Sequence, residues 1–107
     1  MGTDSPELDR LLDRAAGGDE AAVNELFDRH RDRVRRMVAL RLDRRVRDRV
    51  DPSDVVQDVH LALFTRLPDY LADRRLPFFL WLRLEVGQQL IQTHRKHLHA
   101  EMRHPRR

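Results

Sequence analysis

The stretch from Pro77 to His99, PFFLWLRLEVGQQLIQTHRKHLH, constrains the fold most, because it predicts one long amphipathic helix. At 100° per residue its apolar side chains gather on one wide face. They are Phe79, Leu82, Val86 and Leu90, flanked by Leu80, Leu84, Ile91 and Leu98. So wide a face has to be buried against other helices, and the chain is therefore predicted to be an all-α, compact bundle of about four helices.

A narrow polar stripe runs along the other side of this predicted helix. It consists of Trp81, Glu85, Gln88, Gln92, Arg95 and His99, with Gln89 and Lys96 at its edge. Solvated helix faces are usually rich in Glu and Lys, whereas this stripe combines three glutamines with an aromatic ring that we expect to be exposed. Amides can read base edges, cations can neutralise phosphates, and a ring can stack on a base. The stripe predicts a nucleic-acid-binding helix; the alternative is an ordinary surface with one stray tryptophan.

Length and composition exclude several classes of protein. With 107 residues, 36% charged and 40% hydrophobic, the chain is expected to be one soluble domain. Cysteine is absent, which excludes disulfides and thiolate metal sites and fits a reducing compartment. The longest apolar run, FFLWL, is far shorter than the ~20 residues that span a bilayer, and the acidic N-terminus does not resemble a signal peptide. We expect a cytoplasmic protein without membrane association.

Charge is distributed unevenly along the chain. Residues 1–60 hold 12 arginines and 14 acidic residues, a net charge of −2, whereas residues 61–107 hold 9 basic and 4 acidic residues, a net charge of +5. A polyanionic partner is therefore expected at the C-terminal end, and a different partner at the first half.

Capping signals divide the single domain, residues 1–107, into segments. Ser5-Pro6 predicts the start of a short helix, and Gly17-Gly18 its end, so residues 1–18 form an N-terminal helix and turn. Asp19 predicts the start of a long helix, with apolar residues at helical spacing as far as Leu42, and opens a core bundle over residues 19–100. The basic tail, 101–107, is expected to fray. For residues 43–50 the sequence leaves open whether the helix continues or bends.

Asp51-Pro52 predicts a further helix that ends at Leu67-Pro68 and buries the seam Val56, Val59, Leu63 and Leu67. Its opposite face carries Asp54, Gln57, Asp58, Leu61 and Thr65, the spacing of a helix that contacts another helix. This face predicts docking of a basic partner helix. Alternatively it is plain surface, with two acids that complement the helix macrodipole.

Residues 68–76 are predicted to form a loop before the long amphipathic helix. Tyr70, Arg74 and Arg75 lie in it, close in sequence to Trp81. An exposed ring and two guanidinium groups in this position could grip an unstacked base.

Three motifs follow one another along the chain: GDEAAVNELFDRHRDRV, DPSDVVQDVHLALF and PFFLWLRLEVGQQLIQTHRKHL. In this order they resemble region 2 of extracytoplasmic-function (ECF) sigma factors, a group of the sigma-70 family of bacterial RNA polymerase sigma factors. The resemblance extends from Asp19 to about Leu98. It implies a helical domain for transcription initiation, without catalytic residues, metal or cofactor, because RNA polymerase supplies the chemistry.

The resemblance also implies two partners. The helix over 51–67 would dock on the β′ clamp helices of RNA polymerase through Asp54, Gln57 and Asp58, with Leu61 on the same face. The helix over 77–99 and the loop before it would recognise and melt the promoter minus-ten element, capturing its single-stranded non-template strand. The expected DNA contacts are Tyr70, Arg74, Arg75, Trp81, Glu85, Gln88, Gln89, Gln92, Arg95 and Lys96. Here Gln88 replaces the family's usual Asn, and Gln92 a common Asp. Trp81 matches the first aromatic residue of the melting pair in primary sigma factors, and Leu82 stands where those have the second, a departure that ECF members commonly show.

Other hypotheses remain. The chain could be a helical interaction domain that binds only protein, such as an anti-sigma factor, and a sigma-like domain could bind one as well. A metal site formed by His94, His97, His99, Glu101 and His104 is disfavoured, because these residues lie at widely spread angles near a chain end.

Complete ECF factors also carry a helix-turn-helix domain that reads the minus-thirty-five element. This sequence stops before such a domain, and we favour an excised domain over a stand-alone variant.

Overall fold

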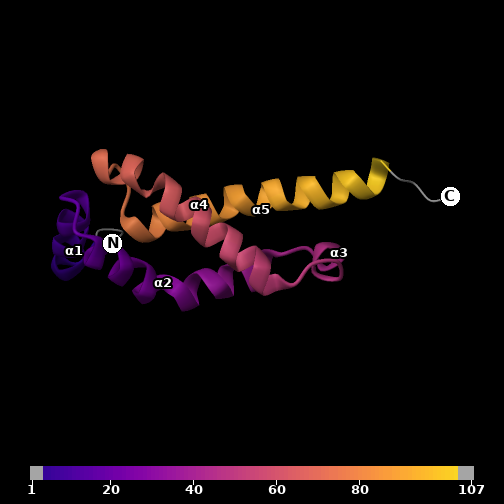
Figure 1. Ribbon diagram of the computed structural model, residues 1–107, viewed down its shortest axis with the longest axis horizontal. Coiled ribbons are helices and arrows are strands. Elements are labelled where there is room, and N and C mark those ends of the chain that lie inside the picture. Colours follow the sequence, from indigo (N-terminus) through magenta and orange to yellow (C-terminus); the bar gives the residue numbers. More distant parts are fainter. Residues whose placement is uncertain (1–3, 104–107) are drawn as a thin grey trace.

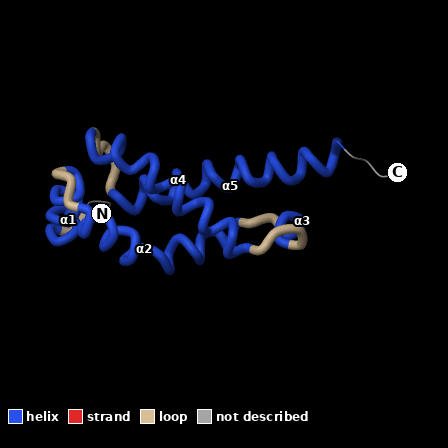
Figure 2. Tube along the Cα trace, viewed as in Figure 1, coloured by secondary structure: helices blue, strands red, loops and turns tan. Residues whose placement is uncertain are grey.

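The computed structural model describes residues 4–103, with side chains for residues 4–98, and these residues form five helices without a strand (Figures 1 and 2). The helices are α1 (Pro6–Ala16), α2 (Glu20–Arg41), α3 (Arg44–Arg47), α4 (Pro52–Ala72) and α5 (Phe78–Arg103). α4 crosses between α2 and α5, α1 packs at one end, and the last turns of α5 extend beyond the other helices (Figure 1). The all-α prediction is confirmed.

The three helix starts that capping signals predicted are confirmed. Ser5 Oγ accepts a hydrogen bond from the Leu8 amide at 3.1 Å, and Asp19 Oδ1 accepts from the amide of Ala21 at 3.0 Å. Asp51 Oδ1 accepts from the Ser53 amide at 3.0 Å. Each cap satisfies an amide that has no partner inside its helix. Such contacts span two or three residues, and for this reason the sequence alone predicts them.

The segment 43–50, which the sequence left open, bends. α2 ends at Arg41, Leu42 adopts an extended conformation, and Asp43 caps the single turn of α3. The Asp43 amide donates a hydrogen bond to Nε2 of His94 at 3.0 Å. This bond links the start of α3 to the second half of α5, and Val46 of α3 is fully buried.

α4 continues beyond Pro68, so the prediction that it ends at Leu67-Pro68 is wrong. A proline inside a helix costs about 3 kcal/mol, because it lacks an amide donor and clashes with the preceding turn. Here the helix continues to Ala72 and buries Leu67 and Tyr70 on either side of the proline. Burial of these two side chains offsets the local cost, and the true connection to α5 comprises only residues 73–77.

α5 is rotated relative to the face that periodicity predicted. Leu82, Val86 and Leu90 are buried as expected, but Phe78 is fully buried and Phe79 only half-buried. The predicted flanking residues Leu80, Leu84 and Ile91 are exposed. The rotation turns Trp81 toward the core and turns an aliphatic strip toward solvent.

The N-terminal segment holds the start of α5. Asp4 accepts hydrogen bonds from the Phe78 amide at 2.9 Å and 3.2 Å, one to each carboxylate oxygen. α5 begins after Pro77 and has no Ser, Thr, Asp or Asn of its own at the cap position, so this distant carboxylate takes that role.

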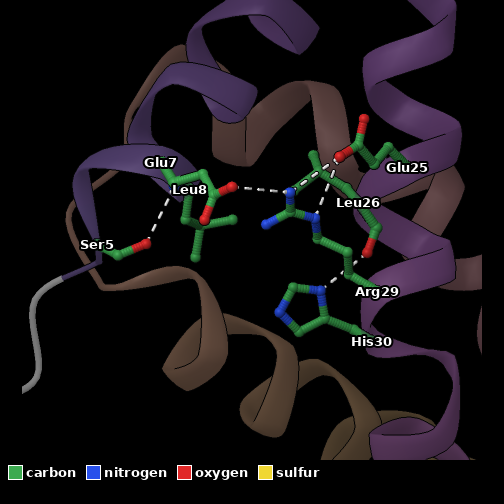
Figure 3. A network of polar contacts seen from close by, with 7 residues as sticks. All are labelled: Ser5, Glu7, Leu8, Glu25, Leu26, Arg29 and His30. Atoms are coloured by element: carbon green, nitrogen blue, oxygen red, sulfur yellow. Dashed lines mark hydrogen bonds and ion pairs between the residues drawn. The ribbon is translucent and has the colours of Figure 1, made fainter.

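Figure 3 shows the nearby link between α1 and α2, in which Arg29 pairs with Glu25 at 2.9 Å and with Glu7 at 3.6 Å.

Replacing Asp4 by alanine should lower the free energy of unfolding by about 1 kcal/mol, the usual cost of losing a helix cap. Thermal and urea unfolding followed by circular dichroism measure the loss. Asp4→Asn is the matched control, because its side-chain oxygen can still accept from the Phe78 amide, and it should retain most of the stability. Equal stability of the wild type and Asp4→Ala would contradict the capping role.

Candidate protein- and nucleic-acid-binding surfaces

Trp81 lies in the core, so the expectation that it is exposed on a polar stripe is wrong. Only 8% of the residue is accessible to solvent. Its ring stacks on Tyr70, with centroids 4.8 Å apart and planes inclined by 26°, and contacts Phe78 at 5.6 Å. These contacts come from α4 and from the preceding turn of α5, and the helical wheel of α5 alone could not reveal them.

Tyr70 is buried too, in α4 rather than in a loop. The residue is 5% exposed, and its hydroxyl donates a 2.6 Å hydrogen bond to the carbonyl oxygen of Leu76. Burial raises the pKa of the Tyr70 phenol to about 12. Neither Tyr70 nor Trp81 presents a free ring face, so this surface cannot stack a base on them in the described conformation.

The two arginines of the connection between α4 and α5 lie near the surface, and each pairs with an acid. Arg74 contacts Asp13 of α1 at 2.6 Å, and Arg75 contacts Asp73 at 2.8 Å. Exposed pairs of this kind contribute little stability. Each guanidinium group is thus held by a carboxylate near the surface.

Of the other residues in the predicted stripe, some are exposed to solvent and others are covered or bonded to α4. Gln88, Gln92, Arg95 and Lys96 are exposed, whereas Gln89 is half-buried. Glu85 is largely covered and pairs with Arg66 of α4 at 2.7 Å, which links the two helices. The side chain of His99 lies outside the described residues. The exposed part of the stripe is thus the half of α5 that follows Gly87.

The face of α4 that the sequence predicts to dock a partner helix is exposed, as expected. Asp54, Gln57, Asp58 and Leu61 all face solvent. Among residues 4–103, neither Asp54 nor Asp58 has an ion-pair partner. We use the name "acidic face" for these four residues.

Sequence analysis missed Phe64, which is 57% exposed and extends the acidic face by one turn. Its ring lies 6.1 Å from that of Phe27 on α2. The signal was present, because Phe64 follows Leu61 at the i, i+3 spacing of a shared helix face. Leu61 and Phe64 form an apolar end to a charged surface, an arrangement common in protein interfaces.

The acidic face and the exposed stripe adjoin one another across a groove between α4 and α5. Asp54 and Asp58 line one wall of the groove, and Gln89, Gln92 and Lys96 line the other. The two surfaces that the sequence assigned to separate partners are therefore neighbours in space. Partners bound to both would lie side by side.

His94 has a structural role, because its Nε2 atom accepts the hydrogen bond from the Asp43 amide. This nitrogen is therefore already occupied and is not free to bind a metal. The part of the chain that the structure describes contains no group of three potential metal ligands. Of the disfavoured metal set, His104 lies outside the described residues, as do the side chains of His99 and Glu101.

None of the helices over residues 4–103 is long and apolar enough to cross a membrane.

Comparison with known proteins supports the family that the motifs indicated. The chain is 33% identical over 88 residues to the ECF RNA polymerase sigma factor SigD of Mycobacterium tuberculosis and of Mycobacterium bovis. The match covers 82% of this chain but only 41% of each relative. No family model matches the chain, and no solved structure matches it significantly. The similarity supports an ECF sigma factor domain, and the all-α fold is consistent with the region 2 type.

Since Trp81 is the only tryptophan, its fluorescence tests its burial directly. The native protein should emit at shorter wavelength than in urea, because the indole is removed from water, and acrylamide should quench native emission weakly. Unfolding in urea should restore strong quenching. Equally strong quenching in both states would place the ring at the surface and contradict the stacked arrangement with Tyr70.

Proposed function

We propose that this domain acts in transcription initiation, binding the β′ clamp helices of RNA polymerase through α4 and recognising and melting the promoter minus-ten element through α5. The observation that carries the proposal is the exposed pair Asp54 and Asp58, which has no partner among residues 4–103, beside the exposed amide and cationic residues of α5. Similarity to ECF RNA polymerase sigma factors supports the same function.

The acidic face is suited to a basic partner helix. Asp54 and Asp58 lie one turn apart, and Gln57 between them can both donate and accept hydrogen bonds. Leu61 and Phe64 supply apolar area at one end, which a partner can cover to exclude water from the polar contacts. Charges fix partner and register, and the apolar end adds affinity.

The α5 surface is suited to a strand of nucleic acid. Arg95 and Lys96 can hold phosphates, while Gln88 and Gln92 lie one turn apart and can hydrogen-bond base edges. A surface that binds only the unpaired strand shifts the duplex toward the open state. No chemical step or cofactor is required of this domain, which we propose to be non-enzymatic.

Burial of Tyr70 and Trp81 changes how a base would be captured. The stacked pair packs α4 against α5, and the Tyr70 hydroxyl holds the connection between them through the Leu76 carbonyl oxygen. Base capture then depends on the exposed amides and guanidinium groups instead of stacking on either ring. Loss of two stacking rings weakens the DNA surface, and this observation favours the second candidate, a domain that binds only protein, such as an anti-sigma factor.

Asp58→Arg should abolish capture of a β′ clamp-helix fragment in a pull-down, because it reverses the charge at the centre of the acidic face. Helical circular dichroism should not change, since Asp58 is exposed. The matched control is Asp69→Arg, which makes the same charge change on α4 eleven residues further, about 16 Å along the helix. The control should still bind. Loss in both variants would indicate a net-charge effect, and binding by Asp58→Arg would remove this residue from the interface.

Arg95→Ala with Lys96→Ala should weaken binding of a fluorescent single-stranded minus-ten oligonucleotide, measured by anisotropy. Each lost phosphate contact should make the slope of log affinity against log salt less negative by about 0.7, the value for single strands. Gln92→Ala should instead reduce discrimination between oligonucleotide sequences, because amides read base edges. Arg10→Ala, on α1, is the control for loss of a surface cation. If the wild type does not bind the strand but still captures the clamp fragment, the protein-only candidate is correct.

A further inference from the structure

A second groove, between α2 and α5, lies apart from the acidic face. Its floor is aliphatic, with Leu40 84%, Leu84 56% and Ile91 52% exposed and Met37 and Leu80 beside them. On α2 the lining residues are 33, 36, 37, 40 and 41, and on α5 they are 79, 80, 83, 84, 87, 88 and 91, so each helix contributes one continuous stripe, and the α5 stripe includes Gln88 of the exposed stripe described above. Monomeric proteins rarely expose so many aliphatic side chains together unless a partner covers them.

Arginines form the rim of this groove. They are Arg33, Arg36 and Arg41 on α2 and Arg83 on α5. Among residues 4–103, none of the four has a carboxylate partner. Elsewhere on α2 the arginines are neutralised, since Arg31 pairs with Asp28 and Arg35 with Asp32. The helix therefore places its unpaired positive charge specifically along the aliphatic groove.

Arg41 covers the floor at Gly87, which is buried. A Cβ atom at this position would lie 2.9 Å from the Arg41 guanidinium, so glycine lets Arg41 lie directly against the backbone of α5. Arg33 lies over the ring of Phe79, with 4.6 Å between its guanidinium carbon and the ring centroid. This contact covers the aromatic face that could otherwise stack a base.

We infer that this groove is a docking site for an acidic amphipathic helix of a partner protein. Aliphatic side chains at helical spacing fill an aliphatic floor, and flanking carboxylates pair with the four rim arginines. The lined part of α5, residues 79–91, is about 18 Å long, which matches three to four turns of a partner helix. A second copy of this chain fits poorly, because it would bring two arginine rims together. A nucleic-acid strand would pair its phosphates with the rim arginines but would leave the exposed aliphatic floor uncovered.

The probe is a fluorescent 15-residue helical peptide with leucines on one face and glutamates on both sides of it. Two control peptides carry lysine in place of glutamate, or the same residues with the leucines scattered. The full 107-residue chain should bind the first peptide saturably and the controls at least tenfold more weakly. Amide chemical shifts of the ¹⁵N-labelled protein should change along residues 33–41 and 79–91.

Leu84→Ser should weaken peptide binding at least about tenfold, because it removes one aliphatic contact from the floor. Arg36→Gln should weaken binding several-fold and reduce its dependence on salt. The matched controls, Leu61→Ser on α4 and Arg10→Gln on α1, remove an equally exposed leucine and arginine and should bind within twofold of the wild type.

Three outcomes would overturn the inference. They are no saturable binding of the acidic peptide, equal weakening by the control variants, and competition by a single-stranded oligonucleotide that depends on Arg36 and Leu84. A dimer that Leu84→Ser dissociates is a fourth such outcome, because it would assign the groove to a second copy. Asp58→Arg and Lys96→Ala leave the groove unchanged, so the result does not depend on the proposed function.

Discussion

One aromatic cluster determines how the helices fit together. Phe78 of α5 contacts His30 of α2, Tyr70 of α4 and Trp81 of α5, and Tyr70 also stacks on Trp81, with ring centroids between 4.8 and 5.8 Å apart. His30 Nδ1 also bonds to the Leu26 carbonyl oxygen at 2.8 Å, and burial lowers the pKa of His30, which favours the neutral ring. Such contacts stabilise each pair by about 0.5–1.5 kcal/mol beyond simple burial. The cluster joins all three long helices at one end of the bundle.

This cluster explains why α4 continues beyond Pro68 and why α5 is rotated relative to the face that periodicity predicted. α4 must continue through Pro68 to deliver Tyr70, and α5 must rotate to deliver Trp81. The same rotation that buries the indole exposes Leu84 and Ile91. Core packing thus creates the aliphatic floor between α2 and α5.

The charged surfaces follow from the same arrangement. Because α4 crosses α5, the carboxylates of Asp54 and Asp58 stand across one groove from Gln92 and Lys96. The arginine-rimmed groove lies between α5 and α2 instead. α5 therefore contributes to both grooves, and its rotation sets which side chains each one receives.

The sequence by itself determined the all-α class, the starts of α1, α2 and α4, and the exposure of Asp54, Asp58, Gln88, Gln92 and Lys96, because these follow from hydrogen bonds within three residues and from helical periodicity. Its motifs also indicated the sigma factor family that the comparison supports. Only the tertiary structure decided that Trp81 and Tyr70 are buried, that α4 passes Pro68, and that Asp4 caps α5. Each of these depends on contacts between residues far apart in the chain, for which a helical wheel holds no information.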